Sequence, residues 1–267
     1  MGRIAIMPKV TCNSISLYYE TYGEGQPLVL ISGLGGDRTF WQSSLESLSS
    51  RFQVIVFDTR GSGKTEAPTS EYSMKLFADD LAALLDALNI QKANVLGFSM
   101  GGNIALTFAL NYPERVEKLI IAASFAVMNQ QARLFLDAVL SVYEGGASAK
   151  QMFQLIAPWL FSATFLSDPN HAAYLMYDEE DPEEQPLYAW KNQYLAQQAF
   201  NAVSRLHEIK IPTLIISGGM DRLAHPEDSI LLANKIEHAV LRNIPESGHL
   251  INYEYPDEFH RCILEFL

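Results

Sequence analysis

The sequence has few cysteines, few basic residues and no long hydrophobic segment. Among its 267 residues are two cysteines, Cys12 and Cys262, near opposite ends and without the paired spacing of structural zinc sites. We interpret both as unpaired thiols. The longest uncharged apolar run, residues 119–128, is far shorter than the roughly 18 residues that a membrane-spanning helix needs. We therefore expect a cytoplasmic protein that is neither exported nor inserted into a membrane.

Basic residues are outnumbered, because 19 Lys and Arg stand against 31 Asp and Glu and give a net charge of −12. So acidic a surface repels nucleic acids and anionic lipids, and no local basic patch compensates. The composition is 48% hydrophobic and 19% charged, which is typical of a globular protein of one large α/β domain, with or without an insert. We expect a monomer or homodimer with a small-molecule substrate, no nucleic-acid partner and no membrane partner.

The first third of the chain alternates between strand-like and helix-like segments, which is typical of a largely parallel sheet. The continuous apolar runs at residues 28–32 and 54–58 predict strands buried on both faces, whereas residues 14–20 alternate like an edge strand. Residues 73–88 carry a one-sided apolar stripe at helical spacing. Further strands are predicted at 93–97, 118–123, 213–217 and 239–244, and further helices at 99–111, 228–236 and 256–267.

Residues 125–205 interrupt this pattern, because no strand-like run appears there. The segment is rich in Ala, Leu, Gln, Met and aromatic residues, and glycines and prolines, including Pro158, divide it. We interpret it as about four helices inserted between two strands. The predicted organisation is an α/β core of residues 1–124 and 206–267 with a helical insert at 125–205.

A G-x-S-x-G motif at residues 97–101 lies between a predicted strand and a predicted helix, which is the context that a nucleophilic serine turn needs. Glycines at 97 and 101 remove side chains that would clash with neighbouring backbone, so the turn can hold Ser99 in a strained, accessible conformation. The N–H of Met100 then lies at a helix N-terminus, where it can stabilise an oxyanion. Ser99 is the candidate nucleophile.

A serine hydroxyl needs a base, and the base needs an acid that orients it. Asp221 follows the strand at 213–217, and His249 lies in a turn after the last predicted strand. Asp58 also ends a strand, but it precedes Ser99 and would break the order serine, aspartate, histidine of one known triad type. The other histidines, which fall in the insert, in predicted helices or near them, are His171, His207, His225, His238 and His260.

Two further turns contain clustered glycines. Residues 32–36 (SGLGG) follow a predicted central strand and offer the N–H of Leu34 as a second oxyanion donor. Residues 61–65 (GSGKT) end like a phosphate-binding loop, but that loop would need Gly at position 58 and a helix where Pro68 stands. We interpret residues 61–65 as a surface turn that binds no nucleotide.

Together these motifs resemble the α/β-hydrolase-fold serine hydrolases of the esterase and enol-lactonase type over nearly the whole chain. The resemblance rests on residues 32–36, 58–63, 97–102, 112–116, 218–221 and 248–249. It implies that Ser99, His249 and Asp221 form the triad, with the amides of Leu34 and Met100 as the oxyanion hole. It also implies that the insert at 125–205 is a helical cap over the site. Ser32 and Ser62 stand where the family often has histidine, which leaves the substrate open.

The resemblance implies hydrolysis of a small to medium carboxylic ester, with no metal and no organic cofactor. An apolar cap suits an acyl or aryl group, and we expect Leu34, Met128, Trp159 and Phe161 to contact the substrate. The same triad could serve an enol-lactonase, a carbon–carbon bond hydrolase or a cofactor-free haloperoxidase. The alternative of another class is a non-catalytic receptor that only binds a small ligand in the capped cleft.

Overall fold

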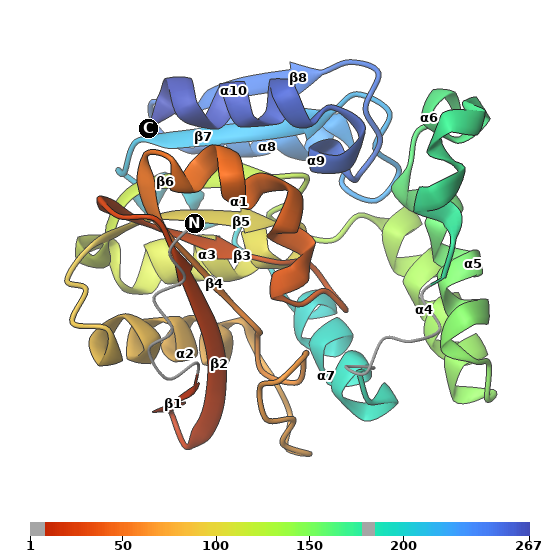
Figure 1. The fold of residues 1–267 in the computed structure, drawn as a ribbon, viewed down its shortest axis with the longest axis horizontal. Coiled ribbons are helices and arrows are strands. Elements are labelled where there is room, and N and C mark those ends of the chain that lie inside the picture. The colour runs from red at the N-terminus through yellow and green to blue at the C-terminus, as the bar shows by residue number, and fades with distance from the viewer. Residues whose placement is uncertain (1–8, 178–184) are drawn as a thin grey trace.

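The computed structural model describes residues 9–177 and 185–267, and its core is one eight-stranded sheet (Figure 1). The strand order is β1-β2-β4-β3-β5-β6-β7-β8. Strand β2 runs antiparallel to both of its neighbours, and all other neighbouring strands are parallel, as the alternating pattern predicted. The strands are β1 (Lys9–Cys12), β2 (Ile15–Tyr22), β3 (Gln26–Ile31), β4 (Phe52–Phe57), β5 (Ala93–Phe98), β6 (Val116–Ala122), β7 (Thr213–Gly218) and β8 (Val240–Ile244).

Helices cover both faces of the sheet, and alternate residues of each central strand pack against opposite layers. In β3, Val29 and Ile31 contact one layer and Leu28 and Leu30 the other, and all four are fully buried. This two-sided burial explains why the central strands are continuous apolar runs. One layer contains α2 (Met74–Ala87), α3 (Met100–Asn111) and α8 (Pro226–Lys235), and the other contains α1 (Gln42–Ser49), α9 (Ile251–Glu254) and α10 (Pro256–Phe266).

Helix α2 illustrates how local sequence sets an element. The side chain of Ser73 accepts a hydrogen bond from the Leu76 N–H at 3.1 Å and so caps the first turn. The apolar stripe, including Phe77 and Leu81, is buried against the sheet. The helix predicted over residues 73–88 is therefore confirmed, with bounds that differ by one residue at each end.

The predicted edge strand is not at the edge. Strand β2 lies second in the sheet, because β1 folds back on it and pairs Cys12 with Ile15. The two residues between these strands, Asn13 and Ser14, have φ angles of 47° and 66°. Positive φ at both positions is the geometry of a tight two-residue hairpin, whose twist matches that of the strands. The sequence interpretation missed β1, which is only four residues long.

The described part of residues 125–205 is mostly helical. In Figure 1, α4, α5 and α6 stand together to the right of the sheet, and α7 lies lower, between them and the core. Helix α5 continues through Pro158, where the sequence suggested an interruption, and ends two residues later at Leu160. The bounds are α4 (Gln130–Glu144), α5 (Ala149–Leu160), α6 (Ala163–Ser167) and α7 (Leu187–Gln198), with 3-10 helices η1 (Arg38–Trp41), η2 (Pro113–Arg115), η3 (Pro169–Leu175) and η4 (Leu206–Glu208).

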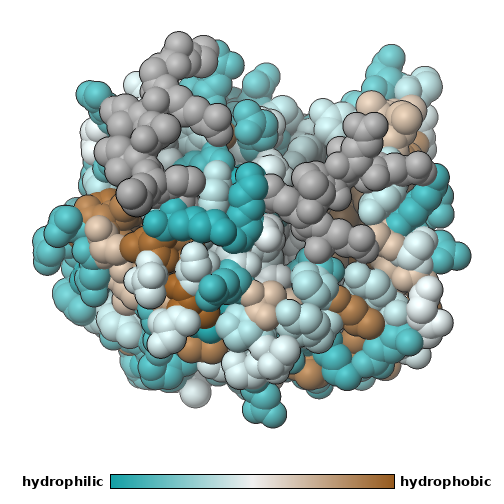
Figure 2. Space-filling view, turned by 60° about the horizontal axis from the view of Figure 1, so that its bottom comes forward, coloured by the Kyte–Doolittle hydropathy of each residue, from teal (hydrophilic) through white to brown (hydrophobic). Residues whose placement is uncertain are grey.

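The surface is mainly hydrophilic on the face that Figure 2 shows. Figure 2 shows one face on which hydrophilic side chains predominate and apolar side chains appear in separate groups. Within residues 9–177 and 185–267, no helix combines the length and the apolar character needed to cross a bilayer. Cys12 and Cys262 are both free, as predicted, and both are buried. Burial raises the pKa of the Cys12 thiol to about 11. Such a thiol is a poor nucleophile.

Candidate active site

Ser99 occupies a sharp turn between β5 and α3. Its φ and ψ angles are 53° and −118°, a strained combination for a residue with a side chain. A Cβ atom added at Gly97 would lie 2.1 Å from the Gly101 carbonyl oxygen, and one added at Gly101 would lie 2.2 Å from the Ile31 carbonyl oxygen. Only glycine at both positions lets strand, turn and helix approach so closely. The Ser124 hydroxyl donates to the Ser99 carbonyl oxygen at 2.7 Å and supports the turn.

The structure brings Ser99, His249 and Asp221 into one hydrogen-bonded row. The Ser99 Oγ lies 3.0 Å from His249 Nε2, although 150 residues separate the two in the chain. His249 Nδ1 lies 2.7 Å from the Asp221 carboxylate, whose other oxygen accepts N–H groups at 2.8 Å and 3.0 Å. A carboxylate only accepts hydrogen bonds, so Nδ1 carries the proton and Nε2 offers its lone pair to the serine. This arrangement can remove the serine proton.

Two backbone N–H groups lie beside the nucleophile. A Cβ atom added at Gly33 would lie 3.1 Å from the Ser99 Cβ, so the turn of residues 33–36 packs directly against the serine. The Gly36 N–H closes this turn on the Gly33 carbonyl oxygen at 3.1 Å. The N–H groups of Leu34 and Met100 donate no hydrogen bond to any other residue that the structure describes. Both N–H groups therefore remain available as hydrogen-bond donors.

A cavity of about 370 Å³ contains the Ser99 and His249 side chains, and its described lining is largely apolar. Leu34 and Phe161, two of the expected substrate contacts, both line it. Neither Arg nor Lys occurs among the described lining residues. In the described ranges, no three His, Cys, Asp or Glu side chains gather so that they could hold a metal ion. The aromatic and aliphatic walls include Phe40, Phe98, Phe125, Phe135, Leu136, Phe153, Ile156, Leu160, Tyr174, Leu223 and Tyr253.

Met128 and Trp159, the other two expected contacts, do not line this cavity. The Trp159 ring stacks on Phe135 with centroids 4.0 Å apart, and both belong to the core of the helical insert. Met128 is buried in the same cluster. The expectation is corrected because α5 directs Trp159 toward α4, whereas Phe161, just beyond the end of α5, lines the cavity.

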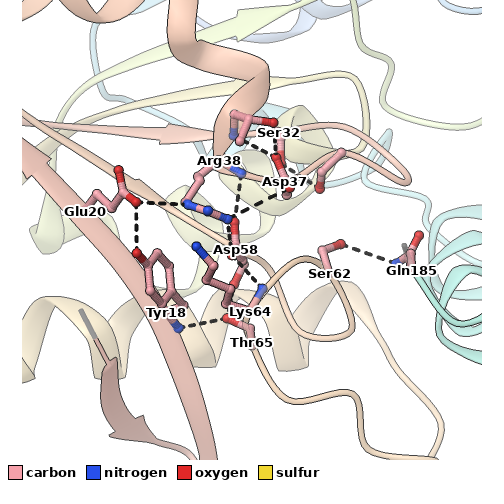
Figure 3. A network of polar contacts seen from close by, with 12 residues as sticks. Tyr18, Glu20, Ser32, Asp37, Arg38, Asp58, Ser62, Lys64, Thr65 and Gln185 are labelled. Carbon is pink, nitrogen blue, oxygen red and sulfur yellow. Dashed lines mark hydrogen bonds and ion pairs between the residues drawn. The ribbon is translucent and has the colours of Figure 1, made fainter. Parts of the chain in front are cut away.

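Asp58, the alternative to Asp221 as the triad acid, instead accepts hydrogen bonds from Arg38 and Lys64 (Figure 3). It is fully buried, and Arg38 donates to it from its backbone N–H at 2.8 Å and from its guanidinium at 3.0 Å. The Lys64 N–H donates to the same carboxylate at 2.9 Å. Burial raises the pKa of Asp58, and these donors oppose that shift. The glycine turn at residues 61–65 therefore folds around a carboxylate of its own chain.

Residues 26–256 match the family described as the alpha/beta hydrolase fold. The chain belongs to the α/β hydrolase family. It is 31% identical over 261 residues to a Caulobacter segnis protein named "Putative carbamate hydrolase RutD", covering 93% of this chain and 95% of that one. It is 29% identical over 257 residues to 3-oxoadipate enol-lactonase 2 of Acinetobacter baylyi, covering 95% and 94%. Among solved structures, it resembles a thermophilic esterase from Thermogutta terrifontis, with a TM-score of 0.86, 27% identity and coverage of 100% and 98%.

These comparisons confirm the predicted fold class and family resemblance of this α/β hydrolase. The relatives carry names for three different substrate classes, namely carbamates, enol-lactones and esters. Family membership alone therefore does not identify the substrate.

The sequence interpretation missed a contact that joins the helical insert of this hydrolase to the segment around His249. The Glu254 carboxylate accepts the Ser162 N–H at 2.9 Å, the Ser162 hydroxyl at 2.6 Å and the Gly248 N–H at 3.1 Å. Burial raises the pKa of Glu254, although these donors favour its ionised form. A Cβ atom added at Gly248 would lie 2.6 Å from the Ser162 nitrogen. The insert thus packs directly against the residue that precedes His249.

A second missed contact joins α7 to the turn of residues 33–36, which is called the oxyanion turn below because the sequence predicts this role for it. The buried Gln193 side chain accepts the Gly35 N–H at 3.3 Å. It also donates to the Arg60 carbonyl oxygen and to the Ser62 hydroxyl, each at 2.9 Å. Gly35 and Gln193 are 158 positions apart, so no local pattern could have indicated the pair.

Proposed function

We propose that this α/β hydrolase cleaves carboxylic esters with a small to medium apolar acyl group, through an acyl-enzyme formed on Ser99. The observation that carries the proposal is the 3.0 Å contact between Ser99 Oγ and His249 Nε2 inside an apolar cavity. A positioned base next to a strained serine is the arrangement needed to activate a hydroxyl near neutral pH.

In the first half-reaction, Ser99 Oγ attacks the ester carbonyl carbon while its proton passes to His249 Nε2. The carbonyl electron pair moves onto the oxygen, which the N–H groups of Leu34 and Met100 stabilise. Collapse of this intermediate breaks the bond to the alcohol oxygen, and the alcohol leaves with the proton from His249. The Asp221 carboxylate accepts the hydrogen bond from the Nδ1–H of His249 throughout and stabilises the transient imidazolium.

In the second half-reaction, a water molecule gives a proton to His249 Nε2 and attacks the acyl carbon. The tetrahedral intermediate collapses, Ser99 Oγ leaves with that proton, and the carboxylic acid is released. The apolar walls keep bulk water away from the oxyanion, which strengthens its hydrogen bonds to the two amides.

The lining of the cavity supports an uncharged acyl group. A carboxylate on the acyl chain would lose its hydration among aromatic and aliphatic side chains without gaining a cationic partner. This disfavours a dicarboxylate-derived lactone such as the one in the Acinetobacter relative's name. A neutral lactone stays a second candidate, because the fold and length match enol-lactonases closely and the same attack opens a ring.

The test is turnover of p-nitrophenyl esters from acetate to decanoate, together with a neutral lactone and a carbamate, by the purified protein. We expect the highest kcat/KM for an ester of intermediate acyl length. Ser99→Ala and His249→Ala should each lower kcat by about 10³-fold or more and abolish labelling by a fluorophosphonate probe. Ser43→Ala, at an exposed serine, is the control and should label normally. A folded wild-type protein that neither labels nor turns over any ester would contradict the proposal and favour a receptor.

A further inference from the structure

A second cavity, of about 390 Å³, borders the catalytic cavity. The two share lining residues, including Leu34 and Gly35 of the oxyanion turn and Trp190 of α7. They therefore meet where the ester carbonyl is held in the proposed reaction. The second cavity differs in character, because Asp37, Thr39, Ser62 and Gln185 supply polar groups to its wall.

Gln185 contributes a buried acceptor oxygen to the described wall of this cavity. Its side-chain nitrogen donates to the Gly61 carbonyl oxygen at 2.8 Å and to the Ser62 hydroxyl at 3.3 Å, which sets the orientation of the amide. Figure 3 shows the Ser62 and Gln185 side chains directed toward each other. The other amide atom, Oε1, is buried and accepts no hydrogen bond from any residue that the structure describes. A buried acceptor without a donor is costly, so its position favours a ligand that carries a donor.

The Gln185 oxygen lies close to the turn of residues 33–36. A Cβ atom added at Gly35 would be 3.8 Å from Gln185 Oε1, and Gly35 follows Leu34 in the oxyanion turn. A hydroxyl on the group bonded to the ester oxygen could therefore reach it while the carbonyl oxygen faces the Leu34 N–H. A hydroxyl can donate to this oxygen, whereas an alkyl group cannot.

The charge of the second cavity selects against anions. The Asp37 carboxylate belongs to its wall and accepts the Thr39 N–H at 2.7 Å. Neither Arg nor Lys is among the described residues that line it. Arg38 lies 3.9 Å from the Asp37 carboxylate but is not among the described lining residues, so an anionic group would meet Asp37 without a cation in that lining. A neutral hydroxylated group would instead meet acceptors.

We propose that the second cavity is the subsite for the alcohol half of the ester, and that this alcohol is uncharged and hydroxylated, like a glycerol unit. The inference rests on the ester hydrolysis proposed above. The acyl half occupies the apolar cavity, the oxyanion turn holds the carbonyl, and the leaving alcohol lies toward Gln185. The preferred substrate is thus an amphiphilic ester, apolar on one side of the carbonyl and hydroxylated on the other.

The experiment compares three esters of one acid, namely glyceryl monobutanoate, pentyl butanoate and the butanoate ester of glycolate. We expect wild-type kcat/KM to be about tenfold higher for the glyceryl ester than for the pentyl ester, and lowest for the glycolate ester. Gln185→Leu, which keeps the size but removes the acceptor, should bring the glyceryl-to-pentyl ratio close to one. Using the ratio within each variant cancels any general loss of activity. The same substitution at an exposed glutamine, Gln154→Leu, should leave the ratio as in the wild type.

Equal wild-type rates for the glyceryl and pentyl esters would overturn the subsite, and so would a preference that survives in Gln185→Leu. The wild-type comparison holds even if that variant does not fold. Turnover of p-nitrophenyl butanoate and labelling of Ser99 are measured in parallel. Both must be present in the wild type for equal rates on the glyceryl and pentyl esters to count against the subsite alone, because their absence would instead refute ester hydrolysis itself.

Discussion

The contact between Glu254 and the helical insert should contribute measurably to stability and catalysis. Replacing Glu254 with alanine removes the acceptor of three hydrogen bonds, two from Ser162 and one from Gly248. Gly248 directly precedes His249, so the same change loosens the support of the proposed base. Replacement with glutamine keeps an oxygen that can accept both N–H groups, and its amide can donate to the Ser162 hydroxyl.

The size of the effect follows from the three donors. Each buried donor that loses its partner costs about 1–3 kcal/mol. Water can enter the space left by the shortened side chain and satisfy part of this loss. We therefore expect Glu254→Ala to lower the free energy of unfolding by about 3 kcal/mol, and Glu254→Gln to lower it by about 1 kcal/mol or less. Glu254→Ala should also lower kcat by a larger factor than it raises KM.

Urea unfolding measures the first quantity, and steady-state kinetics on p-nitrophenyl butanoate measure the second. The informative comparison is alanine against glutamine at the same position, because both remove the charge and only alanine removes the acceptor. If the two variants unfold at the same urea concentration, the hydrogen bonds do not carry the stability, and the reasoning is refuted.

Three further variants test other parts of the structure. His260 is buried and burial lowers its pKa, so the unfolded chain binds more protons below about pH 6.5 and stability should fall on acidification. His260→Gln should flatten this decline in urea unfolding between pH 7.5 and about pH 5.5. Gly97→Ala, which forces a Cβ within 2.1 Å of the Gly101 carbonyl oxygen, should cost about 3 kcal/mol or more in unfolding and slow fluorophosphonate labelling. Gln193→Leu, which frees the Gly35 N–H, should lower kcat about tenfold with little change in KM.

Each of these three variants has a matched control or a result that would contradict the prediction. Equal acid sensitivity of wild type and His260→Gln would assign the pH dependence to other groups. Gly145→Ala, at a helix end with ordinary αR angles, should be nearly neutral where Gly97→Ala is not. Gln154→Leu serves as the surface control for Gln193→Leu. A rise in KM with unchanged kcat in Gln193→Leu would mean that the residue acts on binding rather than on the oxyanion turn.

Much of the fold was predictable because its signals are local. The nucleophile turn places strand, glycines, serine and helix within a few adjacent residues, and steric necessity links them. The central strands were recognisable because burial on both faces demands an unbroken apolar run. Strand β1 was missed because it is short and its pairing depends on the positive φ angles of Asn13 and Ser14, which composition does not express.

The amino-acid order alone thus specified the fold class, the serine turn and a chain order that favoured Asp221 over Asp58. Neighbours in space were set by the packing of distant segments. Sheet order brings the ends of β5, β7 and β8 together, and the rotation of α5 turns Trp159 into the insert while Phe161 reaches the cavity. The contacts of Gln193 and Glu254 join residues that lie far apart in the sequence. Such contacts depend on how whole helices and strands are oriented, and periodicity within one segment carries no information about that orientation.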